Sequence, residues 1–324
     1  MPIVEFTKIS RPKEANINRR SVDEVLGHRT GPSATGSSFY KSLISCPREH
    51  GLVHVAKYRQ KSEKEALTVG VIFHLAMETY YEAIAEHQWQ REALKAPRDD
   101  EYYFGGCPRA QNEAFAALEP FSTEPGYEKT YRDVSFLLSH YFDHYHMQDK
   151  WRIIAVEETL GFRGEFPYTA RVDLIVEDAT RGGMWIVELK SARAISEDLL
   201  LNYQMDLQIL GQVWLMKHCV DLSQYPKFRG VIVNIGTKQV KPQFERLEVC
   251  PSDAHLAAFE ESVASWHVLR KVYEDLEWPR ALGACAGALR GYTRCSFYDL
   301  CHAKPEASVA QLASEEPPEG FIKV

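Results

Sequence analysis

The stretch from Tyr168 to Met216 constrains the fold more than any other part of the chain. It contains two short runs rich in β-branched residues, followed by a helix-like segment; these read YTARVDLIVED, MWIVELKSAR and NYQMDLQILGQVWLM. The turn signal Arg181-Gly182-Gly183 separates the two runs and predicts a β-hairpin. A hairpin followed directly by a helix favours an α/β core.

Three charged residues lie in this hairpin. Glu188 and Lys190 are two residues apart, so they share one face of the second strand, and Leu189 points the other way. Asp173 lies in the first run and can approach Glu188 across the hairpin. Two converging carboxylates suit a hard cation such as Mg²⁺ or Mn²⁺, which lowers the pKa of a bound water. A lysine beside that ion can orient or deprotonate the water, or neutralise charge in the transition state.

An ordinary interpretation competes with the metal site. A lone Glu-x-Lys on a strand is usually a solvated face, and an aspartate at a hairpin edge is equally common. The pattern therefore gains weight only if further elements of such a site occur elsewhere in the chain.

One further element is the helix predicted over Thr68–Glu86. His74 and Glu78 share a face of this helix at i, i+4 spacing, and Gly70 precedes His74 in a G-x-x-x-H pattern. His74 is either packed among apolar neighbours or a metal ligand, and neutral imidazole suits Mn²⁺ better than Mg²⁺.

Another carboxylate precedes the hairpin. Trp151–Glu158 is predicted as a strand, and Glu157 lies at its end. Glu157 is equally compatible with a place near the metal and with an exposed strand end.

Amides mark the helix predicted over Ser196–His218. Four side-chain amides lie in this otherwise apolar segment, at Asn202, Gln204, Gln208 and Gln212. A helix face that points to solvent more often carries Lys and Glu. The glutamines at i, i+4 and i+8 share one face, so we predict that this face points to the active site or to nucleic acid.

The seven cysteines give a second constraint. An odd count without a secretory signal makes a disulfide framework improbable. Cys46 follows a helix that begins near Ser37, whereas Cys285, Cys295 and Cys301 lie within seventeen residues of one another. Four cysteines are the number that a 4Fe–4S cluster needs, but a structural zinc site and buried reduced thiols remain alternatives.

The overall composition excludes some classes of protein. The chain has 324 residues, 45% of them hydrophobic and 26% charged, with a formal net charge of −7. These values are ordinary for a globular protein, and the acidic balance argues against a surface coated in basic residues, although it does not exclude nucleic acid. No apolar run is long enough for a membrane span and no secretory signal begins the chain, so a cytoplasmic protein is expected.

Taken in order, these elements resemble the PD-(D/E)XK nuclease superfamily, and within it the RecB-like iron–sulfur nucleases that include CRISPR-associated exonucleases and phage relatives. The matching positions are Cys46, Gly70, His74, Asp173, Glu188, Lys190, Gln208, Cys285, Cys295 and Cys301. The family motif Q-x-x-x-Y has its glutamine at Gln208, but Gln212 stands at the tyrosine position.

The resemblance implies a restriction-endonuclease-like fold, in which a mixed central sheet is flanked by helices, with a helical N-terminal part and a C-terminal iron–sulfur tail. It implies that His74, Asp173, Glu188 and the Leu189 carbonyl bind Mg²⁺ or Mn²⁺. Lys190 would orient the water or stabilise the transition state, and Gln208 would position the nucleophile or the strand. The four cysteines Cys46, Cys285, Cys295 and Cys301 would hold a 4Fe–4S cluster.

We therefore expect one nuclease domain over residues 37–302, between a flexible arm (1–36) and a mobile tail (303–324). The expected activity is metal-dependent hydrolysis of DNA, as an exonuclease on single-stranded or end-containing DNA in recombination, repair or phage DNA processing. A helicase or recombination protein, or a second copy of the chain, would be its partner in a bacterial or phage-infected cell. The alternatives are a catalytically silent adaptor that binds nucleic acid with the same fold, and a redox protein.

Overall fold

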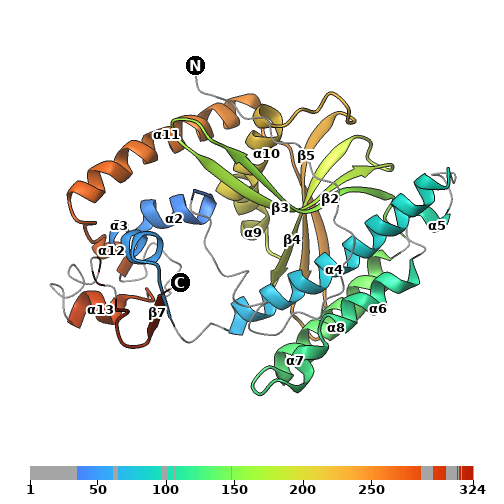
Figure 1. The fold of residues 1–324 in the computed structure, drawn as a ribbon, viewed down its shortest axis with the longest axis horizontal. Coiled ribbons are helices and arrows are strands. Elements are labelled where there is room, and N and C mark those ends of the chain that lie inside the picture. The colour runs from blue at the N-terminus through green and yellow to red at the C-terminus, as the bar shows by residue number, and fades with distance from the viewer. Residues whose placement is uncertain are drawn as a thin grey trace.

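The centre of the protein is a mixed five-stranded sheet in the order β2-β3-β4-β5-β6 (Figure 1). The structure, a computed structural model, describes residues 35–60, 65–95, 101–104, 107–146, 148–285, 295–303, 312, 314 and 316–323. The strands are β2 (Trp151–Phe162), β3 (Tyr168–Asp178), β4 (Met184–Ala192), β5 (Phe228–Thr237) and β6 (Phe244–Val249). Only β4 and β5 pair in parallel, and the chain between them carries two helices, as a parallel crossover requires.

Helices cover both faces of this sheet (Figure 1). The first face packs against α4 (Glu65–Ala93), α6 (Pro108–Ala116) and α8 (Glu128–Tyr145), and the second against α10 (Leu207–Cys219), α11 (Asp253–Asp275) and α2 (Ser37–Ser45). Because both faces are covered, the central strands are continuous apolar runs rather than alternating ones. The predicted α/β fold, a restriction-endonuclease-like mixed sheet flanked by helices, is confirmed.

Short helices complete the described chain. They lie in the connections between the larger elements and near the C-terminus: α5 (Glu101–Phe104), α7 (Glu119–Thr123), α9 (Glu197–Gln204), α12 (Leu282–Cys285) and α13 (Tyr298–Ala303).

The first and last described elements lie side by side, at the left of Figure 1. Helix α3 (Pro47–His50) and the π-helix η1 (Gly51–Val55) lead to β1 (Tyr58–Gln60), which pairs antiparallel with β7 (Phe321–Lys323). Phe321 is buried and stacks on Phe297 with ring centroids 4.8 Å apart. The structure thus differs at these residues from the mobile tail expected over 303–324, whereas the arm expected over 1–36 lies outside the described residues except for its last two.

The single helix predicted over Ser196–His218 is wrong, because the chain forms two helices there. Helix α9 ends at Gln204, and the Asp206 side chain accepts a hydrogen bond from the Gln208 backbone N–H at 2.7 Å, which caps a new helix. Gln208 and Gln212 therefore share a face of α10, whereas Asn202 and Gln204 belong to α9.

Other predicted elements differ mainly at their ends. Strand β2 continues to Phe162, four residues beyond the predicted end at Glu158, and α4 is longer than the predicted Thr68–Glu86. Helix α2 ends at Ser45, directly before the Cys46-Pro47 pair, as predicted from the restriction that proline places on the preceding residue.

Gly211 offers a test of the packing between α10 and β3. A Cβ atom at Gly211 would lie 2.3 Å from the Tyr168 hydroxyl, which donates to the Leu207 carbonyl at 3.0 Å. We expect Gly211→Ala to lower the free energy of unfolding by about 1–3 kcal/mol through overpacking, measured by urea denaturation. Gly161→Ala is the matched control, because its Cβ would meet a Thr169 methyl at an ordinary 3.6 Å. Equal stability of the two variants would contradict this packing.

Candidate active site

Three acidic side chains form a row across neighbouring strands. The pairs Val156↔Leu174 and Glu158↔Val172 place Glu157 of β2 opposite Asp173 of β3. Continuing the register beyond the pair Leu174↔Val187 places Glu188 of β4 opposite Asp173 on its other side. Opposite residues of antiparallel strands have neighbouring side chains, so three carboxylates converge here. Glu157 also has a backbone φ of +50°, a conformation that is uncommon outside glycine and is often found at functional sites.

His74 of α4 completes a compact group with two of these carboxylates. Its Nδ1 lies 3.4 Å from Oδ1 of Asp173, and one ligand atom each from His74, Glu157 and Asp173 lie within 4.8 Å of one another. An imidazole nitrogen and carboxylate oxygens are ligands that Mn²⁺ accepts, so these residues fit a divalent cation.

Glu188 is fixed by hydrogen bonds from two elements. Its Oε1 accepts from Lys190 Nζ at 2.5 Å and from Gln208 Nε2 at 2.6 Å, and its Oε2 accepts from Gln212 Nε2 at 2.6 Å. Lys190 also donates to Gln208 Oε1 at 3.1 Å, which closes a ring of three hydrogen bonds. Glu188 is 1% exposed, so these donors replace the water that the charge has lost.

This arrangement leaves Glu188 able to bind a cation. A carboxylate offers about four acceptor positions, and three of those of Glu188 are used. The remaining position is on Oε2, the oxygen that only Gln212 contacts among the described residues. Asp173 is similarly oriented, because its Oδ2 accepts from the Leu189 backbone N–H at 2.7 Å.

The electrostatics of the group favour an ammonium at Lys190. Burial acts to lower the pKa of Lys190, but the charges of Glu188 and Asp173 outweigh burial and raise it. Burial acts to raise the pKa of Asp173, but His74, Lys190 and the Leu189 N–H lower it overall. Lys190 thus donates hydrogen bonds to Glu188 and Gln208 in this arrangement.

The pKa of Glu188 shifts the other way. Burial raises it first, Asp173 raises it further, and Lys190 and Gln212 oppose the increase. Two neighbouring carboxylates in a buried site repel each other, and a cation bound between them removes that repulsion.

Four of the seven cysteines form a second group, where the first and last described elements of the chain lie side by side. All seven cysteines are described and none is in a disulfide. Four of them are at most 7% exposed beside one another in the terminal elements: Cys46, Cys285, Cys295 and Cys301. Cys46 and Cys285 are in hydrogen-bonding contact, and burial, Cys285 and Cys46 raise the pKa of Cys301 to about 11.

Two guanidinium groups lie beside these thiols. Arg48 donates to the Trp278 carbonyl at 2.6 Å, Arg280 donates to the Cys301 carbonyl at 2.8 Å, and both lower the pKa of Cys301. Both positive charges act on Cys301, Arg48 also acts on Cys46, and Arg280 also acts on Cys285; such charges suit a bound group with net negative charge. In the described chain, no three cysteines are packed as tightly as His74, Glu157 and Asp173. A tetrahedral zinc site brings its sulfurs to about 3.8 Å from one another, whereas an iron–sulfur cluster binds them at separate irons.

Most of the predicted site residues come together. Asp173, Glu188, Lys190 and Gln208 form one connected group, with His74 beside it, and the Leu189 backbone is tied to Asp173. Sequence reasoning left Glu157 undecided; it placed Gln212 on a glutamine face pointing to the active site or to nucleic acid, and the structure brings Gln212 to Glu188. The register opposite Asp173 would have been the signal for Glu157, but it becomes visible only once β2 and β3 are paired.

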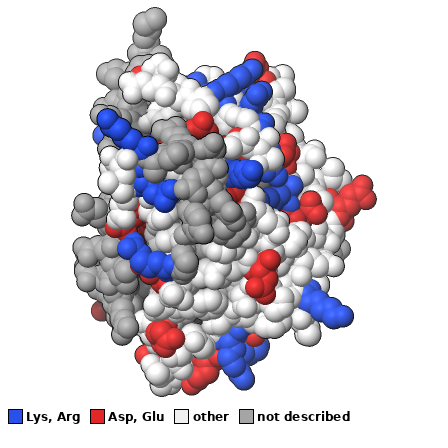
Figure 2. Space-filling model, turned by 90° about the vertical axis from the view of Figure 1, so that its right-hand side faces the viewer, with Lys and Arg blue, Asp and Glu red and all other residues white. Residues whose placement is uncertain are grey.

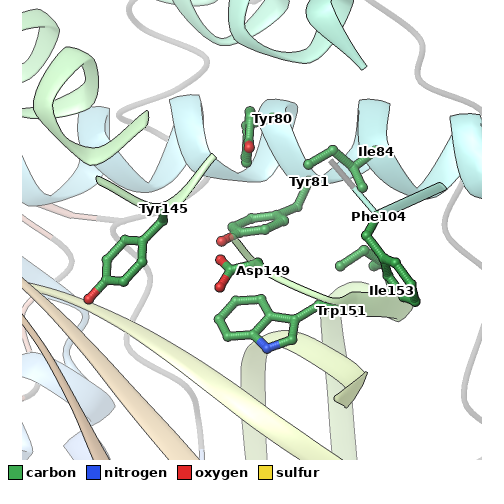
Figure 3. A pocket seen from close by; sticks show the side chains of 8 residues that line it. All are labelled: Tyr80, Tyr81, Ile84, Phe104, Tyr145, Asp149, Trp151 and Ile153. Carbon is green, nitrogen blue, oxygen red and sulfur yellow. The ribbon is translucent and has the colours of Figure 1, made fainter. Parts of the chain in front are cut away.

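A small cavity elsewhere is part of the core rather than of this site (Figure 3). It has a volume of about 10 Å³, and aromatic side chains from α4, α8 and β2 surround it together with Asp149. Asp149 holds Arg246 through two contacts of 2.5 and 2.7 Å, and the Arg246 guanidinium lies 3.6 Å from the Tyr145 ring centroid. That volume accommodates about one water molecule, so the cavity has no room for a substrate.

The sequence matches the PD-(D/E)XK nuclease superfamily over residues 37–302, and the chain belongs to this superfamily. Its members are nucleases that use divalent metal ions. No curated protein matches the sequence.

Two solved structures resemble the chain. One is a crystal structure of a protein from Eubacterium rectale that carries the provisional name exonuclease; it is 12% identical, with a TM-score of 0.45, and the match covers 83% of this chain and 87% of that one. The other is the crystal structure of SSO0001, which is 12% identical, with a TM-score of 0.26, over 70% of this chain and 84% of that one.

No helix in the described residues is long and apolar enough to cross a membrane. On the face drawn in Figure 2, the basic and acidic side chains that are coloured are interspersed. The formal charge of −7 therefore does not give this face a single sign.

Gln212 provides a test of the metal site. We expect Gln212→Leu to weaken Mn²⁺ binding by about 10- to 100-fold, because Glu188 Oε2 loses the amide that orients it. Isothermal titration calorimetry measures this change. Gln90→Leu is the matched control, since Gln90 is exposed on α4 and contacts only Glu86 among the hydrogen bonds described. Unchanged affinity in Gln212→Leu would contradict the proposed orientation of Glu188.

Proposed function

We propose that this protein is a divalent-metal-dependent deoxyribonuclease, an exonuclease that hydrolyses phosphodiester bonds in single-stranded DNA or DNA with free ends. The observation that carries this proposal is the compact group of His74, Glu157 and Asp173, beside which Glu188 of the next strand is hydrogen-bonded to the Lys190 ammonium. Membership of a nuclease superfamily supports it.

His74, Asp173 and Glu188 would hold Mg²⁺ or Mn²⁺ together with the Leu189 carbonyl, and Glu157 is placed to join them. When bound, the ion supplies an acidified water and a positive charge at the phosphate. In hydrolysis the water oxygen forms a bond to phosphorus as the bond from phosphorus to one ester oxygen breaks. The water proton passes to the solvent, and the leaving ester oxygen takes up a proton from the solvent.

The chain's own residues orient the reacting groups. The Lys190 ammonium can donate to the attacking water or to a phosphoryl oxygen, where charge increases in the transition state. Gln208 holds both Lys190 and Glu188, so it positions the lysine rather than reacting itself.

For the second group we propose a 4Fe–4S cluster on Cys46, Cys285, Cys295 and Cys301. The four buried sulfurs and the two arginines near Cys301 support it. A cluster there would join helix α2 to the C-terminal elements, so its role would be structural.

We also propose the domain boundaries, the cellular process and the partners of this nuclease. Residues 37–302 would form a single nuclease domain, acting in the cytoplasm of a bacterial or phage-infected cell during recombination, repair or phage DNA processing. A helicase or recombination protein would supply unwound DNA, and a homo-oligomer is compatible with the proposal. A catalytically silent adaptor is the second candidate, but the intact Asp173, Glu188 and Lys190 favour the enzyme.

The test is cleavage of end-labelled linear DNA, single- and double-stranded, by protein purified without oxygen in Mg²⁺ or Mn²⁺. Asp173→Ala and Lys190→Ala should each lower the rate by about 100-fold or more, because each removes charge from the reacting centre. Lys217→Ala is the matched control, since within the described residues the one ion pair of Lys217 is with the exposed Asp253.

Closed circular DNA separates the two modes of cleavage, because an exonuclease leaves it intact. Failure of the cluster-loaded wild-type protein to cleave any DNA, together with retained DNA binding, would contradict the enzyme and support the adaptor. Cleavage that survives both active-site substitutions would show that the site lies elsewhere.

A further inference from the structure

Arg171 places a guanidinium against the compact group of His74, Glu157 and Asp173, although no role has yet been given to it. It lies on β3 two residues before Asp173, so the two side chains share one face of the strand. The register pairs Arg171 with Thr159 of β2, which makes Glu157 its diagonal neighbour. Long side chains reach across such a diagonal, and Arg171 Nε lies 2.9 Å from Oε2 of Glu157.

The exposure of these side chains increases from the carboxylates outward. The side chains of Asp173 and Glu157 are 10% and 14% exposed, whereas the Arg171 side chain is 49% exposed. The Lys190 side chain lies between these values, at 25%. A substrate that approaches the carboxylates from the solvent therefore meets Arg171 at the rim of the site.

The backbone at Arg171 is tied to the buried part of the site. Gln212 Nε2 donates to the Arg171 carbonyl at 3.2 Å, and the same amide nitrogen donates to Glu188 Oε2 at 2.6 Å. The position from which the guanidinium extends is therefore fixed relative to Glu188.

The guanidinium keeps donors for a second partner. It carries five N–H bonds in a planar fork, and a contact through Nε leaves the edge formed by the two terminal nitrogens. Within the described residues, the one ion pair of Arg171 is with Glu157. Two oxygens of a phosphate match such an edge in shape and in charge.

The electrostatics of the site call for a positive charge here. Three converging carboxylates repel the phosphodiester backbone, and the metal ion with Lys190 compensates this repulsion only at the phosphate that reacts. The neighbouring phosphate needs a cation of its own. Arg171 is the one basic residue of β3, and it lies on the face that carries Asp173.

We propose that Arg171 binds the phosphate next to the one that is cleaved, and so holds the DNA strand across the carboxylates. This inference rests on the proposed nuclease function and adds a substrate contact to the same site. The contact is to a phosphate and not to a base, so it fixes the position of the strand without a preference for sequence.

The test measures binding of single-stranded oligonucleotides to the full-length protein, purified without oxygen, in Ca²⁺ at a series of salt concentrations. Arg171→Ala should lower the affinity about tenfold, as expected for one lost hydrogen bond to a charged group. The slope of log affinity against log salt should decrease in magnitude by about 0.7, the value for one phosphate contact on a single strand. Arg171→Lys should retain the slope, because the charge remains.

Arg229→Ala is the matched control for these measurements. Arg229 is exposed near the start of β5, where Phe228 pairs with Met184. Glu188 pairs with β5 further along, so the control arginine lies at the other end of this strand pair. Its affinity and salt slope should equal those of the wild type.

A methylphosphonate scan locates the contact. A single methylphosphonate, which removes the charge of one linkage, is placed at successive positions from the end of the oligonucleotide. At one linkage the substitution should weaken wild-type binding about tenfold and Arg171→Ala binding little, because the partner of that phosphate is already missing.

Two results would overturn the inference: an affinity and salt slope of Arg171→Ala equal to those of the wild type, or equal losses for the two proteins at every methylphosphonate position. A merely structural role for the pair with Glu157 would give these results together with weaker Mn²⁺ binding by calorimetry, since Glu157 alone would lose its partner.

The same measurements separate this inference from the proposed function. If the wild-type protein cleaves DNA and Arg171→Ala binds it as tightly, the nuclease stands and the contact is rejected. If the wild-type protein cleaves no DNA in Mg²⁺ or Mn²⁺ but Arg171→Ala shows the smaller slope, the contact stands and hydrolysis is rejected.

Discussion

The candidate active site depends on one buried charge, the Glu188 carboxylate. Burying an isolated carboxylate costs several kcal/mol unless donors replace its water. Lys190 comes from the same strand, but Gln208 and Gln212 come from α10, so this helix must lie across the end of β4. Asp206 caps the N-terminus of α10, and this helix places Gln208 and Gln212 one turn apart on the face that donates to Glu188.

Helix α2 links α10, and with it the candidate active site, to the cysteine group. Lys41 of α2 contacts Asp206 at 2.7 Å, and Tyr40 of the same helix stacks on Tyr168 with ring centroids 5.9 Å apart. Helix α2 ends directly before Cys46. A group bound by the cysteines would therefore fix a helix that contacts the N-terminus of α10. This connection gives a physical reason why a structural cluster would matter to a nuclease site some distance away.

Much of this arrangement could be predicted from the sequence. Alternation along a strand placed Glu188 and Lys190 on one face, and the turn at Arg181-Gly182-Gly183 brought Asp173 towards them. These inferences depend on local geometry, which a sequence pattern reports well.

The remaining features depend on contacts between distant segments. The break at Asp206 was missed because the apolar periodicity runs through it, although a capping aspartate was present. Glu157 could be neither assigned nor excluded, since its position follows from a strand register that the sequence does not specify. The pairing of Tyr58–Gln60 with Phe321–Lys323 joins segments more than 250 residues apart, and neither segment is long enough to give a strand signal.

For the proposed phosphodiester hydrolysis, this row of carboxylates must bind a divalent cation. The most direct measurement is an anomalous-difference map from crystals of the protein grown with Mn²⁺. We expect a peak bonded to His74 Nδ1 and to oxygens of Asp173 and Glu188, within reach of Glu157. A well-ordered site without any peak there, or a peak bound only by residues outside this group, would contradict it.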